Sequence, residues 1–263
     1  MNDLKISIIT ISYNCEAEIE ETILSVVSQT YENKEYIIID GGSMDKTMQI
    51  VDKYRDKIDV VVSEPDKGRS DAFNKGIAKA TGDYIVMINA GDMLADDALN
   101  KFVKAYKPGY DVIKGNTIRW NYETGHRSIE TPVIKYSAIP FQFYVCHQST
   151  YISKEAYKHY GVYEVDLRIV MDFELMLRFT KVGATFYTID ENLAIFRMGG
   201  ISQVSSNKRL EEMKYALKKN GRSSIAIFVF ICYIRLRTLI RILLDKINPD
   251  LKSYLVTKRN NIF

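Results

Sequence analysis

The chain has 263 residues, 46% of them hydrophobic and 26% charged, which is typical of a globular protein without low-complexity tracts. Its three cysteines are an odd number without metal-ligand spacing, which argues against a disulfide frame. Three histidines are too few for a His-rich zinc site. The first residues lead directly into a predicted strand and lack the layout of a signal peptide. We therefore expect a cytoplasmic protein with reduced thiols.

The net charge of +3 is distributed unevenly along the chain. Residues 205–263 contain 13 Lys/Arg and 4 Asp/Glu, a net charge of +9, which leaves residues 1–204 at −6. A basic segment favours an anionic partner. The charge pattern therefore suggests an acidic main domain at 1–204 and a basic tail at 205–263.

Strands and helices alternate in the first 92 residues. Runs of apolar and β-branched residues predict strands at residues 5–12, 35–39, 59–63 and 84–88. Polar segments with helical spacing of apolar residues predict helices at residues 16–29, 45–56 and 70–79. This alternation with short loops predicts an α/β fold with a mostly parallel, doubly wound sheet. In such sheets ligands bind at the carboxyl ends of the strands.

The pattern is looser after Asp92. The predicted helices are residues 96–106, 153–159 and 170–182. The predicted strands are residues 111–114, 116–122, 147–153, 185–189 and 193–196. Residues 197–202 contain a Gly-Gly pair and are expected to form a loop that can close over a ligand.

The basic tail contains a charged helix at 207–220 and an apolar segment at 224–234. About a dozen residues are too few to cross a bilayer, which takes roughly 20. Arginines 235, 237 and 241 follow, interleaved with leucines and isoleucines, a pattern typical of a helix that lies in the membrane interface. The alternative is a helix packed on the protein's own core.

The fourth predicted strand ends in Asn89-Ala90-Gly91-Asp92. A carboxylate beside very small residues at a strand's carboxyl end suggests a metal that bridges to phosphates. The alternative is an Asx/Gly turn in which Asp92 caps the next helix.

Three further loops resemble this corner: Thr10-Ile11-Ser12-Tyr13-Asn14, Asp40-Gly41-Gly42-Ser43, and Glu64-Pro65-Asp66-Lys67-Gly68 followed by Asp71 and Asn74. In this order, the four motifs resemble those of the family 2 inverting glycosyltransferases of the GT-A fold, most closely the bacterial branch that builds O-antigen, capsule and exopolysaccharide. The resemblance covers about residues 4–204. It divides them into a nucleotide-sugar-binding half at 1–92 and an acceptor half at 93–204.

The resemblance implies a set of residues that border the nucleotide and its sugar. They are Thr10, Ser12, Tyr13, Asn14, Glu18, Asp40, Lys67, Gly68, Asp71, Asn74, Asn89, Ala90, Gly91 and Arg197. Asp40 is expected to accept a hydrogen bond from the base. Arg197, before the Gly-Gly loop, is expected to reach the diphosphate, with a surface salt bridge as the alternative.

Catalytic and acceptor-side residues follow from the same resemblance. Met171-Asp172 stands where the family usually has Glu-Asp, so Asp172 is the candidate base, with a helix-terminal structural role as the alternative. His147 and Gln148 are expected at the donor sugar or the acceptor, although His147 could also be a core-edge histidine. Glu174 is a reserve candidate that faces away from Asp172.

The resemblance also implies a divalent metal, Mn²⁺ or Mg²⁺, on the donor diphosphate. Asp92 is its expected ligand, because Gly91 occupies the position where the family most often has the metal-binding aspartate. Phe73 likewise replaces a customary arginine on the third helix.

The expected function is transfer of a sugar, with inversion, from a nucleotide-sugar such as a UDP-sugar to a hydroxyl of a lipid-linked oligosaccharide. The expected location is the cytoplasmic face of the plasma membrane, held there by the tail, with no nucleic-acid partner and with a homodimer left open. Two alternatives remain, a nucleotidyltransferase and a catalytically silent nucleotide-binding scaffold. The loop at residues 13–18 lacks the glycines and cations typical of the former.

Overall fold

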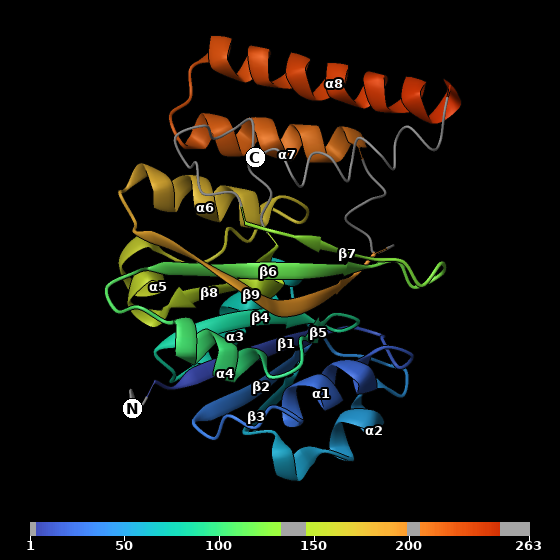
Figure 1. The fold of residues 1–263 in the computed structure, drawn as a ribbon, viewed down its shortest axis with the longest axis vertical. Helices are drawn as coiled ribbons and strands as arrows, with labels where there is room; N and C mark the ends of the chain where they lie inside the picture. The colour runs from blue at the N-terminus through green and yellow to red at the C-terminus, as the bar shows by residue number, and fades with distance from the viewer. Residues whose placement is uncertain (1–3, 133–145, 199–205, 248–263) are drawn as a thin grey trace.

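The computed structural model describes residues 4–132, 146–198 and 206–247. A single twisted sheet runs through the middle of the molecule and has helices on both faces (Figure 1). Its strands follow the order β3-β2-β1-β4-β8-β6-β9-β5, and β7 pairs with β6 outside that path. The predicted α/β class is confirmed.

The amino-terminal half of the sheet is parallel. Its strands are β1 (Ile6–Ser12), β2 (Lys34–Asp40), β3 (Val60–Ser63) and β4 (Tyr84–Asn89). The connecting helices are α1 (Ile19–Val27), α2 (Thr47–Asp52) and α3 (Arg69–Lys79). The register places Ser12 opposite Asp40 and Asp40 opposite Ser63, so these strands end at one common edge.

The second half of the sheet is mixed. Its strands are β5 (Met93–Leu94), β6 (Val112–Trp120), β7 (Arg127–Glu130), β8 (Thr150–Ser153) and β9 (Phe186–Arg197). The helices are α4 (Ala98–Ala105), α5 (Lys154–Tyr160) and α6 (Met171–Lys181). β8 joins the two halves, because it runs antiparallel to both β4 and β6. β9 runs parallel to β6, and β5 and β7 are short antiparallel additions.

Several predicted boundaries in this half were wrong. Gly115 does not end a strand: β6 continues through it, with an irregular register against β9. A side chain at Gly115 would lie 2.5 Å from Leu193, so this glycine permits a close approach of β9. The two strands predicted at 185–189 and 193–196 are likewise one strand, β9.

Some short elements also differ from the predictions. The strand predicted at 147–153 begins with a 3₁₀ turn, η3 (His147–Ser149), and the helix predicted at 45–56 is α2 followed by a second 3₁₀ turn, η1 (Arg55–Lys57). Both 3₁₀ turns have too few residues to show a periodicity in the sequence. The predicted cap of α5 is confirmed, since the Ala156 N–H donates to Ser153 Oγ at 3.0 Å.

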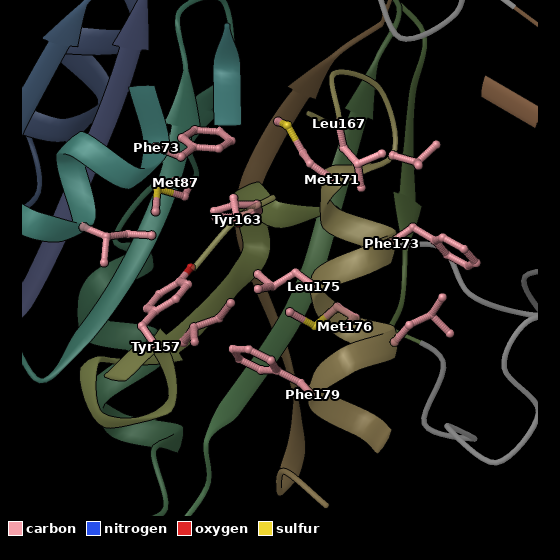
Figure 2. Packing of buried hydrophobic residues seen from close by; sticks show 14 of the residues in the cluster. Phe73, Met87, Tyr157, Tyr163, Leu167, Met171, Phe173, Leu175, Met176 and Phe179 are labelled. Atoms are coloured by element: carbon pink, nitrogen blue, oxygen red, sulfur yellow. The ribbon is translucent and has the colours of Figure 1, made fainter. Parts of the chain in front are cut away.

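Two hydrophobic clusters pack on the sheet. One lies under α1 and α4, where Ile23 and Phe102 are fully buried. The other contains the inward face of α6, and Figure 2 shows Met171, Leu175 and Phe179 of this helix within it. Burial of this apolar face fixes α6 against the sheet and so positions its first turn.

Helices α7 (Ser206–Lys219) and α8 (Ser224–Ile247) stack on α6, farthest from the parallel half of the sheet (Figure 1). Ala216 and Leu217 of α7 and Phe230 and Ile231 of α8 are buried in the α6 cluster. One face of α8 therefore packs on the protein. Among the described residues, no helix combines the length and apolarity needed to cross a membrane. The predicted closing loop from residue 199 and the chain after residue 247 lie outside the described residues.

Candidate active site

Asp92 lies at the carboxyl end of β4 and is almost fully buried. Its Oδ2 accepts hydrogen bonds from Gln148 Nε2 at 2.5 Å and Asn89 Nδ2 at 3.2 Å. Its Oδ1 accepts one from the Arg197 backbone N–H at 3.0 Å. Burial raises the pKa of Asp92, although the hydrogen bonds and the neighbouring His147 oppose this rise. Asp92 thus joins β4, η3 and β9 at one point.

His147 connects this point to Asp172. Its Nδ1 lies 2.9 Å from Asp172 Oδ2, and its Nε2 lies 3.0 Å from Asn89 Nδ2. A carboxylate only accepts and an amide nitrogen only donates, so a neutral His147 carries its proton on Nδ1 and accepts at Nε2. The two hydrogens of the Asn89 amide then serve His147 and Asp92.

Two oxygens at this site are buried without a hydrogen-bond partner in the described part of the chain, Asn89 Oδ1 and Asp172 Oδ1. A buried acceptor without a donor is costly, which makes such atoms candidates for a ligand contact. The Tyr163 hydroxyl is close to Asp172, and the pKa of Tyr163 is raised well above its ordinary value by burial first and then by the charges of Tyr157 and Asp172. Tyr163 is therefore a neutral phenol.

Asp172 is positioned by the start of α6 and by packing around His147. It is the second residue of the helix, where a negative charge is favoured. The Phe73 ring contacts His147 edge to face, with centroids 5.4 Å apart. Phe73 is fully buried, so the residue that replaces the customary arginine supports the histidine ring. This contact could not be predicted from sequence, because Phe73 and His147 lie on distant segments of the chain.

Glu174 and Arg178 have structural contacts. Glu174 is fully buried, and its carboxylate pairs with Arg178 at 3.1 Å and accepts from Asn220 at 3.2 Å. The reserve candidate for catalysis thus binds Arg178 of α6 and Asn220, the residue after α7, as expected for a residue that faces away from Asp172.

Asp40 has all of its hydrogen-bonding capacity used by its own chain. Its Oδ1 accepts from Ser12 Oγ and Ser43 Oγ, and its Oδ2 accepts from Ser63 Oγ and from the backbone N–H groups of Gly42 and Ser43, all within 2.5–3.0 Å. The side chain is fully buried. A nucleobase could bind to Asp40 only by replacing one of these bonds, so the carboxylate serves to hold the loops after β1, β2 and β3 together.

The other predicted donor-side residues fall into two groups. Thr10 and Asn74 are engaged inside the fold: Thr10 Oγ1 bonds to Tyr36, and the Asn74 amide pairs with both backbone groups of Tyr163. Residues of the second group lie at the edge formed by the strand ends. They are Ser12, Tyr13, Asn14, Glu18, Lys67, Gly68, Asp71, Asn89, Ala90 and Gly91.

At that edge, Gly91 lies beside Glu18 and has a φ of +97°. This left-handed backbone conformation favours glycine, and it directs the following residue, Asp92, into the protein. Asp71 accepts from the Lys67 backbone N–H at 3.0 Å. The Arg197 guanidinium stacks on Tyr122, 3.8 Å from the ring centroid, and lies 3.7 Å from Glu21. The surface contacts that were the alternative for Arg197 are therefore present.

The residues around Asp92 do not form a ready metal site. No group of three or more His, Cys, Asp or Glu side chains suited to a metal occurs in the described ranges. Asp92, the predicted ligand, already accepts three hydrogen bonds, and Asn89 Oδ1 is the buried oxygen beside it that has no partner among the described residues. A metal would therefore have to displace one of these donors.

An α/β sheet with polar loops at its strand ends can bind a ligand at that edge, and a half-buried carboxylate held by a histidine can act there as a base. Comparison with known proteins gives the family: residues 7–165 match the family described as Glycosyl transferase family 2. The chain belongs to this family, and it is a glycosyltransferase.

Proteins that are similar in sequence are also named as glycosyltransferases. EpsE of Bacillus subtilis, a protein named as a glycosyltransferase, is 30% identical over 72% of this chain and 71% of its own length. An uncharacterised glycosyltransferase of Haemophilus influenzae is 39% identical, over 38% of this chain and 42% of its own length. The shared region therefore spans less than half of the Haemophilus protein.

Solved structures agree on the fold. TarS of S. aureus, residues 1–349 in complex with UDP, has a TM-score of 0.61 with 19% identity, over 81% of this chain and 64% of that structure. The mannosyltransferase PcManGT from Pyrobaculum calidifontis, in complex with GDP-Man and Mn²⁺, has a TM-score of 0.64 with 15% identity, over 88% and 68% of the two chains. At these identities the likeness establishes the fold alone.

Proposed function

We propose that the chain is an inverting glycosyltransferase that moves a sugar from a UDP-sugar to a hydroxyl of a lipid-linked oligosaccharide in surface polysaccharide synthesis. TarS has also been solved with UDP-GlcNAc, which supports a uridine nucleotide as donor. The similarity to the poly-β-1,6-N-acetyl-D-glucosamine synthase of Staphylococcus epidermidis, 31% identical over 51% of this chain, supports a polysaccharide pathway.

The main support for this proposal is the environment of the Asp172 carboxylate. One oxygen is held by His147 at 2.9 Å, and the other is buried without a hydrogen-bond partner in the described part of the chain. Inversion requires a single displacement and one base. Asp172 Oδ1 takes the proton of the acceptor hydroxyl while that oxygen attacks the anomeric carbon. The bond from the anomeric carbon to the diphosphate breaks, and the nucleoside diphosphate leaves with the electron pair.

His147 orients the base in this proposal. Its Nδ1–H fixes one lone pair of Asp172, which leaves the opposite oxygen for the acceptor. The Asn89 and Phe73 contacts hold the ring in place. The divalent metal of the sequence analysis stays a prediction, and no step depends on it.

The outer face of α8 is proposed to bind the membrane. Exposed apolar side chains cover it: Ile225, Phe228, Val229, Leu236, Leu239, Ile240 and Leu243. A groove of about 440 Å³ between α7 and α8 adds the cations Lys214, Lys218 and Arg235 to apolar walls. Apolar and basic side chains on one surface match an anionic lipid layer, and the acceptor proposed here is itself anchored in lipid.

Donor binding tests this proposal. A thermal-shift panel of UDP-, GDP-, CDP- and ADP-sugars, each with Mn²⁺ or EDTA, should show a UDP-sugar raising Tm by about 5 °C at a hundredfold excess over Kd. The Asp92→Ala variant should lose the part of the shift that requires Mn²⁺. If no nucleotide-sugar stabilises the protein under either condition, the proposed function is wrong.

A further inference from the structure

Helices α7 and α8 enclose a groove that is separate from the candidate active site. Its volume is about 440 Å³, which is within the usual range of ligand pockets. Lys214 and Lys218 line it from α7, and Arg235 lines it from α8. All three cations are exposed, whereas the lining residues Ile227 and Ile231 are half-buried and buried. The groove thus combines a positively charged rim with an apolar floor.

The three cations of the groove have no carboxylate partner among the described residues. Lys219, the next lysine on α7, differs from them because it pairs with Glu164. Cations that converge on one hollow repel one another, so this arrangement favours a ligand with more than one negative charge. A phosphodiester lipid such as phosphatidylglycerol carries a single negative charge, whereas a lipid diphosphate carries at least two. The charge of the groove therefore favours the diphosphate.

The apolar floor of the groove is fixed against α6. Ile231 is buried in the α6 cluster, and the neighbouring Phe230 ring stacks on Phe173 of α6. The two ring centroids are 6.2 Å apart, and the ring planes differ by 12°. Phe173 directly follows the proposed base, Asp172. The groove is therefore built on the same packed layer as the helix that carries the base.

We infer that this groove holds the diphosphate end of the lipid that carries the acceptor. Lysine and arginine donate charge-assisted hydrogen bonds to phosphate oxygens, and the start of the hydrocarbon chain lies on the apolar floor. The sugar chain of the same molecule extends from the groove towards Asp172. The inference rests on the proposed function, because it assigns a site to the lipid end of the proposed acceptor, while the outer face of α8 contacts the bilayer.

Cys232 can report whether the groove is occupied, because it lines the groove and is the exposed one of the three cysteines. Burial raises the pKa of Cys15 to about 11 and the pKa of Cys146 to about 12. A maleimide reacts with thiolates, so it should label Cys232 first. The Cys232→Ser variant should lose this fast labelling, which identifies the residue that is measured.

Farnesyl diphosphate is the probe, because it joins a diphosphate to a single apolar chain. At ten times its Kd it should slow the labelling of Cys232 about tenfold, since it leaves about one groove in eleven empty. Inorganic diphosphate lacks the chain, and dihexanoyl-phosphatidylglycerol lacks the second charge. At the same concentration each of them should slow the labelling much less.

The Lys218→Glu variant tests the charged rim. The concentration of farnesyl diphosphate that gives half protection should rise about tenfold, because an anion replaces one of the three cations. The matched control is Lys208→Glu, at an exposed residue of α7 that does not line the groove, and it should be protected like the wild type. Each variant is labelled with and without the probe, so that a change in thiol reactivity cancels.

Four results would overturn the inference. They are equal protection by dihexanoyl-phosphatidylglycerol, equal protection by inorganic diphosphate, no protection of the wild type by farnesyl diphosphate, and unchanged protection in Lys218→Glu. The first would assign the groove to ordinary membrane lipids and the second to an anion alone. Failure of the proposed function is distinguishable from all four, because the thermal-shift panel measures nucleotide-sugar binding without any lipid.

Discussion

Asp40 shows how one buried carboxylate organises the loops that follow β1, β2 and β3. Burial raises the pKa of Asp40, but hydrogen bonds from Ser43, Ser63 and Ser12 together outweigh that effect, so its pKa lies below the ordinary value of 3.8. A group whose pKa falls on folding stabilises the folded state above its unfolded pKa. That stabilisation is lost as the pH falls through the lower, folded-state pKa.

The Asp40→Asn variant should therefore be less stable than the wild type by about 2–4 kcal/mol near neutral pH, because three loops lose charged hydrogen bonds. The difference in stability should shrink as the pH falls below 3.8, because Asp40 of the wild type then becomes protonated and loses its charge. Urea unfolding at a series of pH values measures it, with Asp56→Asn as control. A difference that does not change with pH would contradict this account of Asp40.

The sequence predicted some residues of the site correctly but not the contacts of others. Asp92, His147 and Asp172 were identified by motif, and the structure brings them together through Asn89. The internal contacts of Asp40 and Asn74 were not predictable, because their partners Ser63 and Tyr163 lie on other segments. A motif identifies a polar residue at a strand end, but the rest of the fold decides whether its lone pairs remain free.

At the scale of elements, α7 holds the start of α6, the helix that carries the proposed base Asp172. Glu212 of α7 is buried, and its Oε2 accepts the backbone N–H groups of Arg168, Ile169 and Val170 at 2.8–3.2 Å. These residues directly precede α6 and Asp172. Backbone N–H groups just before a helix have no carbonyl partner within that helix. The Glu212 carboxylate accepts hydrogen bonds from these three groups and so fixes the path of the chain into α6.

The Glu212→Ala variant should lose about 2–3 kcal/mol of unfolding free energy, because three backbone N–H groups lose their charged acceptor and that of Val170 is buried. The loss of Glu212 should displace Asp172 but not the strand-end loops that are proposed to bind the donor. The kcat of the variant should therefore fall by a larger factor than its KM for the donor rises. Glu212→Gln should restore part of both losses, and the exposed neighbour substitution Glu211→Ala is the control. Equal kcat values in Glu212→Ala and the wild type would show that Glu212 does not position Asp172.

The sequence predicted most elements of the parallel half, because long apolar runs between short loops are a strong signal. It missed β5 and β7, which have two and four residues. The tail helix was predicted to begin at residue 224 and to continue through Arg235, Arg237 and Arg241, and α8 covers this segment with 24 residues. Alternating arginines and leucines weaken the apolar pattern there without ending the helix.

At the scale of the whole molecule, the carboxy-terminal helices have two roles. α7 and the inner face of α8 belong to the core beside α6, through Leu217 and Phe230. The outer face of α8 is apolar and carries Arg235 and Arg237, both exposed. The two alternatives weighed from the sequence, a packed helix and an interfacial helix, are thus compatible.

Phe228→Asp combined with Leu236→Asp should abolish sedimentation with phosphatidylglycerol vesicles, because charges replace side chains that are 69% and 59% exposed on the proposed membrane face. The change should leave the Tm nearly unaltered. Leu24→Asp, at a 46% exposed residue of α1, is the matched control and should still sediment. Unchanged sedimentation of the double variant, or a wild-type protein that does not sediment with the vesicles, would contradict membrane binding by this face.

The central claim is that Asp172 is the base of a sugar transfer, and the most direct test measures transfer by Asp172→Asn. The assay follows radiolabelled sugar from the stabilising UDP-sugar to an extract of polyprenyl-diphosphate-linked oligosaccharides. Asparagine keeps the shape of the site but cannot take the proton, so kcat should fall by about 10²–10⁴-fold while donor affinity stays near that of the wild type. Transfer by Asp172→Asn at the wild-type rate would contradict the account.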